Sequence, residues 1–350
     1  MTASVKKLAK RIAIASGLET ANLLRAAGVM RGARGLGAIF TLHHVRPHEE
    51  STFEPNAHLE ITPEFLDLVL DRLKSDGYRF VALAEIPALL SQTASSQPFA
   101  AFTLDDGYRN NLVYALPIFE KHEAPFTVFV AKGLAERTHT IWWETLAALL
   151  RKEEKLGFDF GSGHEMLDVT TTDAKERVFA RIANHLHRHD ESAAVAAIDL
   201  MARKHEIDPD EIVDDLVMTP AELNLLEASP LASLGAHTIS HRAMSRLSDP
   251  EVRDEMEASR DYVAAITGDR PSSFAYPYGT REAATQRQAA IAREVGFQIA
   301  VTTQPGVVTQ RSLGSITYLP RFSINGIYQN VRYVSGLASG IPFRFAPNRA

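Results

Sequence analysis

The feature that most constrains this chain is a regular alternation of short apolar segments with segments of helical periodicity. After the helix-start pair Thr62-Pro63, apolar residues repeat at helical spacing from Phe65 to Leu73, which predicts a capped helix. The apolar segments predicted as strands are 37–42, 78–83, 99–104, 126–130, 231–236, 274–276, 297–302 and 318–322. Repeated strand–helix units imply a parallel sheet, either open or closed as a barrel. In both arrangements the chemistry collects at the carboxyl ends of the strands.

Residues 139–228 interrupt this alternation. The segment is largely helical and charged in pattern and contains no strand pattern, so it is predicted to be a helical insertion. Thr219-Pro220-Ala221-Glu222 near its end has the form of a capping box with proline at the first helical position. The predicted organisation is a basic helical segment, a first part of the sheet, the insertion, a second part of the sheet and a tail: 1–36, 37–138, 139–228, 229–325 and 326–350.

Charge is unevenly distributed, and the basic residues gather at the beginning. Residues 1–40 contain seven Lys or Arg and one acidic residue, while the whole chain has a net charge of −6. Such a segment is typical either of weak contact with an anionic membrane surface or of a solvated helix docked on the domain. The overall charge is too small to imply a polyanionic partner, so no nucleic-acid partner is expected. No secretory signal or membrane-spanning pattern is evident, which predicts a cytoplasmic protein, with peripheral membrane contact as the alternative.

The chain contains no cysteine and 13 histidines. A thiolate nucleophile and a cysteine-based zinc site are therefore excluded. Any metal site must use His, Asp or Glu side chains.

Two adjacent carboxylates, Asp105 and Asp106, follow the apolar segment 99–104 and precede Gly107. Placing two like charges beside a core is costly, and a metal ion bound to one of them removes that cost. The alternative is an ordinary Asp-Gly turn, and this motif alone does not decide between them.

His237 and His241 follow the segment 231–236 at a spacing of four residues. They share one face if a helical turn begins there, so both imidazoles can bind one metal ion. Neutral imidazoles with one carboxylate suit Zn, Co or Ni. The alternative is a chance pair of surface histidines.

Two further segments end predicted strands. Pro277-Tyr278-Gly279 is an aromatic-proline turn, and Arg321 places a cation after the segment 318–322. Taken alone, each is compatible with a purely structural role.

Taken together and in this order, these motifs resemble the polysaccharide deacetylase family with the NodB homology domain, over roughly residues 38–325. The resemblance implies a distorted (β/α) barrel of about seven strands. It also implies Asp105 as general base, Asp106, His237 and His241 as ligands of one divalent metal ion, and the Tyr278 backbone N–H as an oxyanion donor. Zinc is the expected ion, with cobalt or nickel as alternatives.

The chain departs from the common family pattern in two places. Ala275 stands where the family often has an arginine that bridges to the base, and no histidine follows His241 to serve as the late-motif acid. Some members supply the acid from an N-terminal strand end, and Thr41-Leu42-His43-His44-Val45 resembles that version. His43 is then the expected general acid, and Arg321 is hypothesised to replace the missing arginine beside Asp105.

The resemblance predicts a metal-dependent hydrolase that removes acetyl groups from N-acetylated oligo- or polysaccharides. Two alternatives remain open from the sequence. An O-acetyl carbohydrate esterase would use the same residues, and a catalytically idle carbohydrate-binding protein could retain the same fold.

Overall fold

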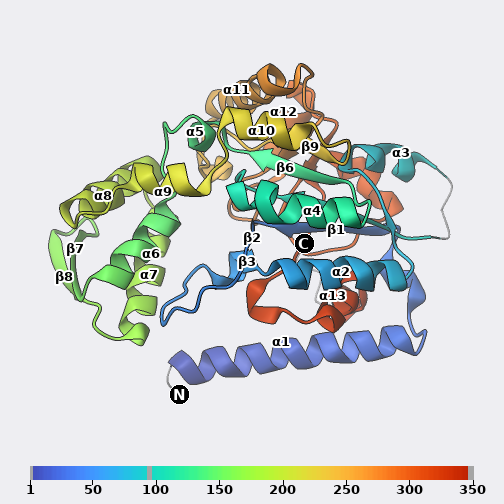
Figure 1. The fold of residues 1–350 in the computed structure, drawn as a ribbon, viewed down its shortest axis with the longest axis horizontal. Coiled ribbons are helices and arrows are strands. Elements are labelled where there is room, and N and C mark those ends of the chain that lie inside the picture. Colours follow the sequence, from blue (N-terminus) through green and yellow to red (C-terminus); the bar gives the residue numbers. More distant parts are fainter. Residues whose placement is uncertain (1–2, 93–96, 346–350) are drawn as a thin grey trace.

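The computed structural model describes residues 3–92 and 97–345 (Figure 1). Seven parallel strands form a curled sheet, and one further short strand, β4 (Arg79–Phe80), pairs with the start of β5. The order across the sheet is β11 (Ile299–Val301), β10 (Ser273–Ala275), β9 (Ala232–Ala236), β6 (Phe126–Val130), β5 (Phe99–Leu104), β1 (Gly37–Leu42) and β12 (Phe322–Ser323).

The two edges of this sheet approach each other through residues 319–323. Leu319 forms a parallel bridge with Val301 of β11, and Phe322 pairs with Phe40 of β1. The sheet therefore curls into a half-barrel with helices around it. The predicted fold class, a distorted (β/α) barrel of about seven strands, is confirmed.

Successive strand residues point to opposite faces of this sheet. Phe40 and Phe102 lie on the outer face, where their rings stack with centroids 5.6 Å apart. Ile39 and Ala101 lie on the inner face, in a separate apolar cluster that fills the barrel. Thr41 and Thr103, the next-to-last residues of β1 and β5, lie on the same inner face and begin the polar floor of the candidate site.

Helices surround the outer face of the sheet (Figure 1). Their bounds are α2 (Pro63–Ser75), α3 (Ile86–Ser91), α4 (Leu116–Lys121), α5 (Lys132–Ala135), α10 (Pro220–Glu227), α11 (Asp249–Thr267), α12 (Gln286–Val295), α13 (Val331–Ala338) and α14 (Ile341–Phe345). Thr62 caps α2 and a capping box begins α10, as the sequence predicts, and a further capping box begins α11. Local start signals therefore fix where these helices begin.

Two of the predicted strands are much shorter in the structure. Only Arg79 and Phe80 pair within 78–83, because a 3₁₀ turn, Leu83–Glu85, follows at once. Within 318–322, a 3₁₀ segment reaches Tyr318 and pairing is limited to single positions before β12. Both predictions were too long because apolar residues pack there without continuous backbone pairing.

The segment 139–228 contains five helices and one hairpin. The helices are α6 (Trp142–Lys152), α7 (Thr172–Leu186), α8 (Glu191–Lys204), α9 (Pro209–Leu216) and α10. The antiparallel hairpin of β7 (Lys155–Asp159) and β8 (His164–Asp168) corrects the expectation that this segment holds no strand. Its strands have few buried residues, which left too little alternation to detect.

These helices pack in two different places. Leu146 and Leu150 of α6 belong with α7 and α8 to an apolar core of their own, at one end of the molecule in Figure 1. Leu223 and Leu226 of α10 belong instead to the outer core of the barrel. The division of the chain at residues 139 and 228 stays a prediction.

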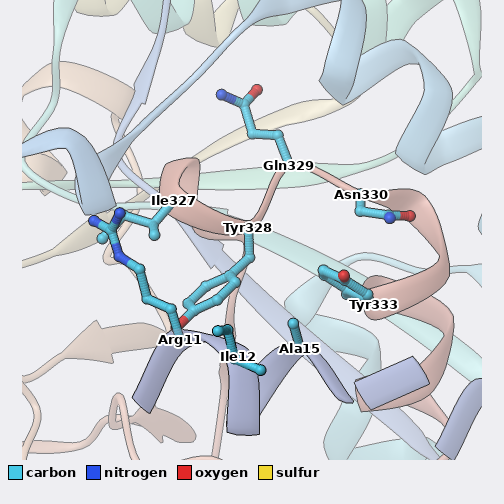
Figure 2. A pocket seen from close by; sticks show the side chains of 8 residues that line it. All are labelled: Arg11, Ile12, Ala15, Ile327, Tyr328, Gln329, Asn330 and Tyr333. Atoms are coloured by element: carbon cyan, nitrogen blue, oxygen red, sulfur yellow. The ribbon is translucent and has the colours of Figure 1, made fainter. Parts of the chain in front are cut away.

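The N-terminal helix α1 (Ala3–Ala26) lies against α13 (Figure 1). Leu18 and Ala21 are buried there, and a side chain on Gly336 would collide with the Leu18 carbonyl. Towards its start α1 is exposed at Lys10 and Ile12. A hollow with a volume of about 320 Å³ lies between this part of α1 and residues 327–333; Figure 2 shows the side chains that line it.

None of the helices within the described residues is long and apolar enough to cross a membrane.

Candidate metal centre and active site

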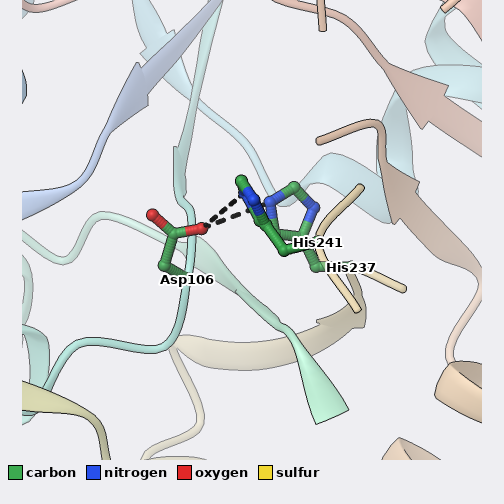
Figure 3. A group of neighbouring side chains, drawn as sticks. All are labelled: Asp106, His237 and His241. Atoms are coloured by element: carbon green, nitrogen blue, oxygen red, sulfur yellow. Dashed lines mark ion pairs between the residues drawn. The ribbon is translucent and has the colours of Figure 1, made fainter. Parts of the chain in front are cut away.

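Three buried side chains converge at the carboxyl ends of β5 and β9. The Asp106 Oδ1 atom lies 3.4 Å from His237 Nε2 and 3.2 Å from His241 Nε2. Figure 3 shows both imidazoles facing that oxygen. The three ligand atoms lie within 4.8 Å of one another, a separation that one metal ion can span.

The donor set of this centre fits a divalent metal ion. His237 uses Nδ1 for a 2.7 Å hydrogen bond with the Ala275 carbonyl, which leaves Nε2 free to face Asp106. Asp106 Oδ1 is buried and has no hydrogen-bond partner. A buried carboxylate oxygen without a donor is costly, and a cation at the centre of the three residues satisfies it.

The loops that carry these residues hold a strained backbone. Asp106, Thr238, His241 and Tyr278 all have positive φ, at 71°, 67°, 54° and 58°. Each such non-glycine residue costs on the order of 1–3 kcal/mol and persists only where its surroundings enforce it. Their concentration around one centre indicates that the loop geometry serves the site rather than the stability of the fold.

Asp105 lies beside this centre in a buried ion pair with Arg321. The guanidinium donates to both carboxylate oxygens at 2.7 Å, and also to Thr103 Oγ1 at 2.9 Å and the Thr302 carbonyl at 2.8 Å. Burial alone would raise the pKa of Asp105, but Arg321 outweighs it and lowers that pKa. Asp105 is therefore held ionised, as a general base must be.

His43 and His44 lie on opposite sides of the chain. His43 is half-buried and lines the same pocket as Asp105 and Asp106. Burial lowers the pKa of His43, and the carboxylates of Asp106 and Asp105 oppose that shift. His44 instead stacks on Tyr108 at 3.6 Å and contacts the Asn110 side chain at 2.7 Å, away from the pocket.

Tyr278 follows β10 and also lines the pocket. Its ring packs edge-on against His241, with centroids 5.0 Å apart. Residues at the ends of β1, β5, β9 and β10 thus surround one cavity. Arg321, from the segment before β12, is fully buried beside Asp105 and does not itself line the cavity.

The family model for polysaccharide deacetylases matches this chain at residues 92–164 and 156–300, well over half of its length. The chain belongs to the polysaccharide deacetylase family. It is thus a carbohydrate deacetylase, a hydrolase that removes acetyl groups from sugars. The matched region contains Asp105, Asp106, His237 and His241, whereas His43 and Arg321 lie outside it.

Solved structures of other deacetylases share this fold at low sequence identity. IcaB from Ammonifex degensii has 18% identity and a TM-score of 0.54, with 87% of this chain and 98% of that chain covered. The Streptococcus pyogenes deacetylase PplD, in complex with acetate, has 17% identity and a TM-score of 0.53, with 83% and 92% covered. A de-N-acetylase from Aggregatibacter actinomycetemcomitans has 12% identity and a TM-score of 0.52, with 85% and 98% covered. A comparison with curated protein sequences found no match.

The pocket of this deacetylase has a volume of about 710 Å³, and residues of the insertion form part of its wall. That volume is in the range of ligand sites for small molecules. Sequence reasoning missed most of the wall, because its members come from distant segments with no shared motif. The residues not anticipated as part of the pocket include Asn56, His58, Phe179, His187 and Arg246.

The adjacent tryptophans of α6 form part of this wall. Both are buried and both line the pocket. Trp142 donates a 2.9 Å hydrogen bond to the Tyr278 hydroxyl, and Trp143 donates one of 3.2 Å to the Tyr108 hydroxyl. They therefore pack and line the pocket at the same time.

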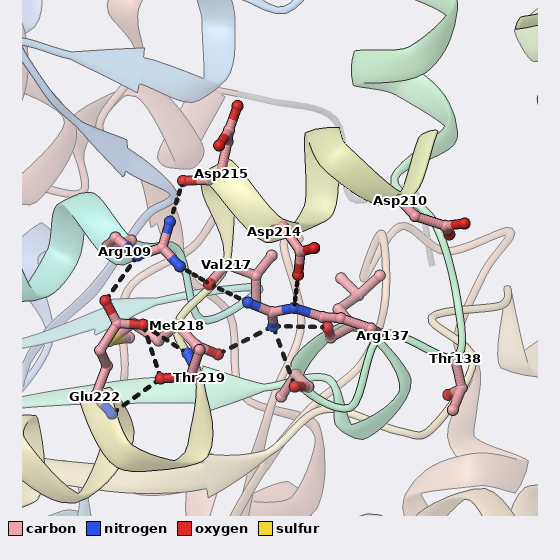
Figure 4. Close-up of polar contacts among 12 residues, drawn as sticks. Arg109, Arg137, Thr138, Asp210, Asp214, Asp215, Val217, Met218, Thr219 and Glu222 are labelled. Carbon is pink, nitrogen blue, oxygen red and sulfur yellow. Dashed lines mark hydrogen bonds and ion pairs between the residues drawn. The ribbon is translucent and has the colours of Figure 1, made fainter. Parts of the chain in front are cut away.

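Two arginines join the end of the insertion to the segments that follow β5 and β6 (Figure 4). The Nη2 atoms of Arg109 and Arg137 both donate to the Val217 carbonyl, at 3.0 and 2.9 Å. The next residue, Met218, donates its N–H to the Gly107 carbonyl at 3.0 Å. The insertion is thus anchored directly on the turn that presents Asp105 and Asp106.

Replacement of Arg321 by lysine should destabilise the protein. An ammonium cannot form the paired contact with Asp105 while also bonding Thr302 and Thr103. Arg321→Lys should therefore lower the free energy of unfolding by roughly 1.5–3 kcal/mol, the scale of hydrogen bonds to a charged group. Denaturant unfolding measures this loss. The control is Arg46→Lys, because Arg46 forms a more exposed ion pair with Glu60. Equal stability of Arg321→Lys and wild type would contradict the importance of the paired contact.

Proposed function

We propose that this protein is a metal-dependent N-deacetylase of acetylated oligo- or polysaccharides. The observation that carries the proposal is the convergence of Asp106, His237 and His241 beside a base, Asp105, that a buried arginine keeps ionised. A protein that only binds sugar needs neither this base nor an acid opposite it. The idle-binder alternative is therefore disfavoured.

A divalent ion held by Asp106, His237 and His241 would polarise the acetyl carbonyl and lower the pKa of a water molecule. Asp105 accepts the proton of that water as it attacks the carbonyl carbon. The Tyr278 backbone N–H donates to the oxyanion that develops. His43 donates a proton to the leaving nitrogen, because an amide anion leaves very poorly without one.

Two nitrogens and one carboxylate oxygen are the ligands expected around zinc in a catalytic site with an open position. Cobalt and nickel accept the same donor set. We propose zinc as the ion, with these two as alternatives.

The N-acetyl preference is tested by acetate release from N-acetylglucosamine oligomers and from acetylated xylan, at equal acetyl concentration. An amine nitrogen leaves only with a proton from a positioned donor, which is the step proposed for His43, so we expect the higher kcat/KM on the N-acetylated oligomers. Fully deacetylated oligomers are the control for background acetate. A higher kcat/KM on acetylated xylan would favour the O-acetyl esterase alternative.

We further propose that the insertion shapes substrate choice, because Trp142, Trp143 and Phe179 supply an apolar side of the pocket. Weak contact of residues 1–36 with an anionic membrane surface, and a cytoplasmic location, also remain proposals. The exposed Lys10, Arg11 and Ile12 of α1 support the membrane contact. The packing of Leu18 against α13 supports a structural role for the rest of the helix.

A further inference from the structure

A single carboxylate of the insertion reaches two of the catalytic loops. Glu191 is the first residue of α8 and is only 7% exposed. Its Oε1 atom accepts a 2.7 Å hydrogen bond from the Tyr278 hydroxyl, and its Oε2 atom accepts one of 2.9 Å from the Ala243 backbone N–H. The two donors belong to loops that follow different strands, β10 and β9.

Each of these loops presents a group used in the proposed reaction. Tyr278 offers its backbone N–H to the oxyanion, and Ala243 lies two residues after the metal ligand His241. His241 and Tyr278 themselves are in ring contact at 5.0 Å. The distance between these two loops therefore depends on the carboxylate that joins them.

A second helix of the insertion holds the same tyrosine. Trp142 of α6 donates its indole N–H to the Tyr278 hydroxyl at 2.9 Å. The Tyr278 hydroxyl thus accepts a hydrogen bond from one helix of the insertion and donates one to Glu191 of another. These contacts lock a residue whose φ of 58° is unfavourable for a tyrosine.

The loop of His241 is held from the barrel side as well. Glu255 of α11 accepts hydrogen bonds from the backbone N–H groups of Ile239 and Ser240, at 2.7 and 3.0 Å. The loop thus lies between a carboxylate of the barrel and a carboxylate of the insertion. Without Glu191, the loop of His241 would lose the carboxylate that holds it from the side of the insertion.

Glu191 has no corresponding role in its own helix. The N-cap of α8 is Asp190, whose side chain accepts from the Ala193 N–H at 3.1 Å. Both oxygens of the Glu191 carboxylate are instead used on the barrel. A buried charge directed entirely at another part of the molecule indicates a purpose beyond helix formation.

We propose that Glu191 is a positioning residue through which the insertion sets the geometry of the metal-ligand loop and the oxyanion loop. The insertion is then part of the catalytic apparatus as well as a wall of the pocket. This inference rests on the proposed function. Glu191 does not line the pocket, so its effect should fall on kcat and metal affinity rather than on KM.

The test compares Glu191→Ala, Glu191→Gln and Asp190→Ala. Groups that orient metal ligands typically contribute 10–100-fold to activity or metal affinity. We expect Glu191→Ala to lower kcat and zinc affinity by about that factor with KM nearly unchanged. In Glu191→Gln the amide oxygen can still accept from either the Tyr278 hydroxyl or the Ala243 N–H, but the amide nitrogen cannot accept from the other. We therefore expect a smaller loss of kcat and zinc affinity than in Glu191→Ala. Asp190→Ala removes the cap of the same helix and should lower only the thermal midpoint.

A double substitution keeps the proposal testable if Glu191→Ala does not fold. Tyr278→Phe removes the hydroxyl that Glu191 accepts from and keeps the ring. In the Glu191→Gln background it should lower kcat much less than it does in the wild type, because the contact is already weakened.

Wild-type kcat and zinc affinity in Glu191→Gln would overturn the inference, as would equal losses of kcat in Glu191→Ala and Asp190→Ala. Zinc affinity, measured by equilibrium dialysis, does not depend on the substrate. If the wild type releases no acetate, the proposed function fails, while zinc affinity still decides the role of Glu191.

Discussion

Replacement of His43 by alanine should lower kcat on N-acetylated oligosaccharides by roughly 10²–10⁴-fold, the usual contribution of a positioned general acid. His43 lines the pocket with Asp105 and Asp106, and no histidine follows His241 in the sequence to serve as the late-motif acid. Metal content should stay unchanged, because His43 is not one of the converging ligands. The loss should be smaller on an activated acetyl ester, whose leaving group departs without a proton.

His44→Ala is the matched control for this prediction. His44 is buried against Tyr108 and Asn110 on the other side of the strand end. Its removal should cost stability and leave kcat of the folded enzyme largely intact. A large loss of kcat in His44→Ala, with wild-type kcat in His43→Ala, would mean that the acid has been assigned to the wrong histidine. Full activity in both variants would remove the last step of the mechanism.

The sequence predicted the central strands well because they are long and uniformly apolar. The predicted bounds 37–42, 99–104 and 126–130 are those of β1, β5 and β6. Helix starts were equally readable where a capping residue and a proline occur together, as at Thr62-Pro63. The short edge segments were overestimated, since packing alone makes 318–322 apolar while its backbone pairs at isolated positions.

The centre of the site was also within reach of the sequence. Asp105, Asp106 and His237 directly follow strands, and parallel strands bring such residues to one edge of the sheet. Arg321 was expected beside Asp105 from its position alone, and the structure places the two in a paired contact. Their roles in catalysis stay predictions.

The contribution of the insertion could not be predicted in the same way. Glu191 is separated from Tyr278 by 87 positions, and locally it is an ordinary glutamate at the start of a helix. The hairpin β7–β8 was missed because most of its side chains are exposed. Long-range packing between two apolar cores decides these contacts, and no local pattern in the sequence reports it.

Replacement of His237 by alanine should abolish both bound metal and acetate release. Two remaining protein ligands, Asp106 and His241, are too few to hold the ion against water. The fold should persist, because His237 makes one side-chain hydrogen bond, to Ala275, that a small residue can lose without breaking the strand. Circular dichroism and thermal unfolding establish that the variant is folded.

A second acid–histidine cluster provides the control. Asp67, Asp71 and His122 also come close enough to suggest a metal site, but two of the three are not buried. His122 contacts Asp67 at 2.6 Å, apart from the pocket. His122→Ala should therefore retain the metal content and acetate release of the wild type.

The most direct test of the account is metal content and acetate release measured on the same preparations of wild type, His237→Ala and His122→Ala. The account predicts one divalent ion per chain and acetate from N-acetylglucosamine oligomers for wild type and His122→Ala, and neither for His237→Ala. A folded His237→Ala variant with full metal content and normal acetate release would contradict it.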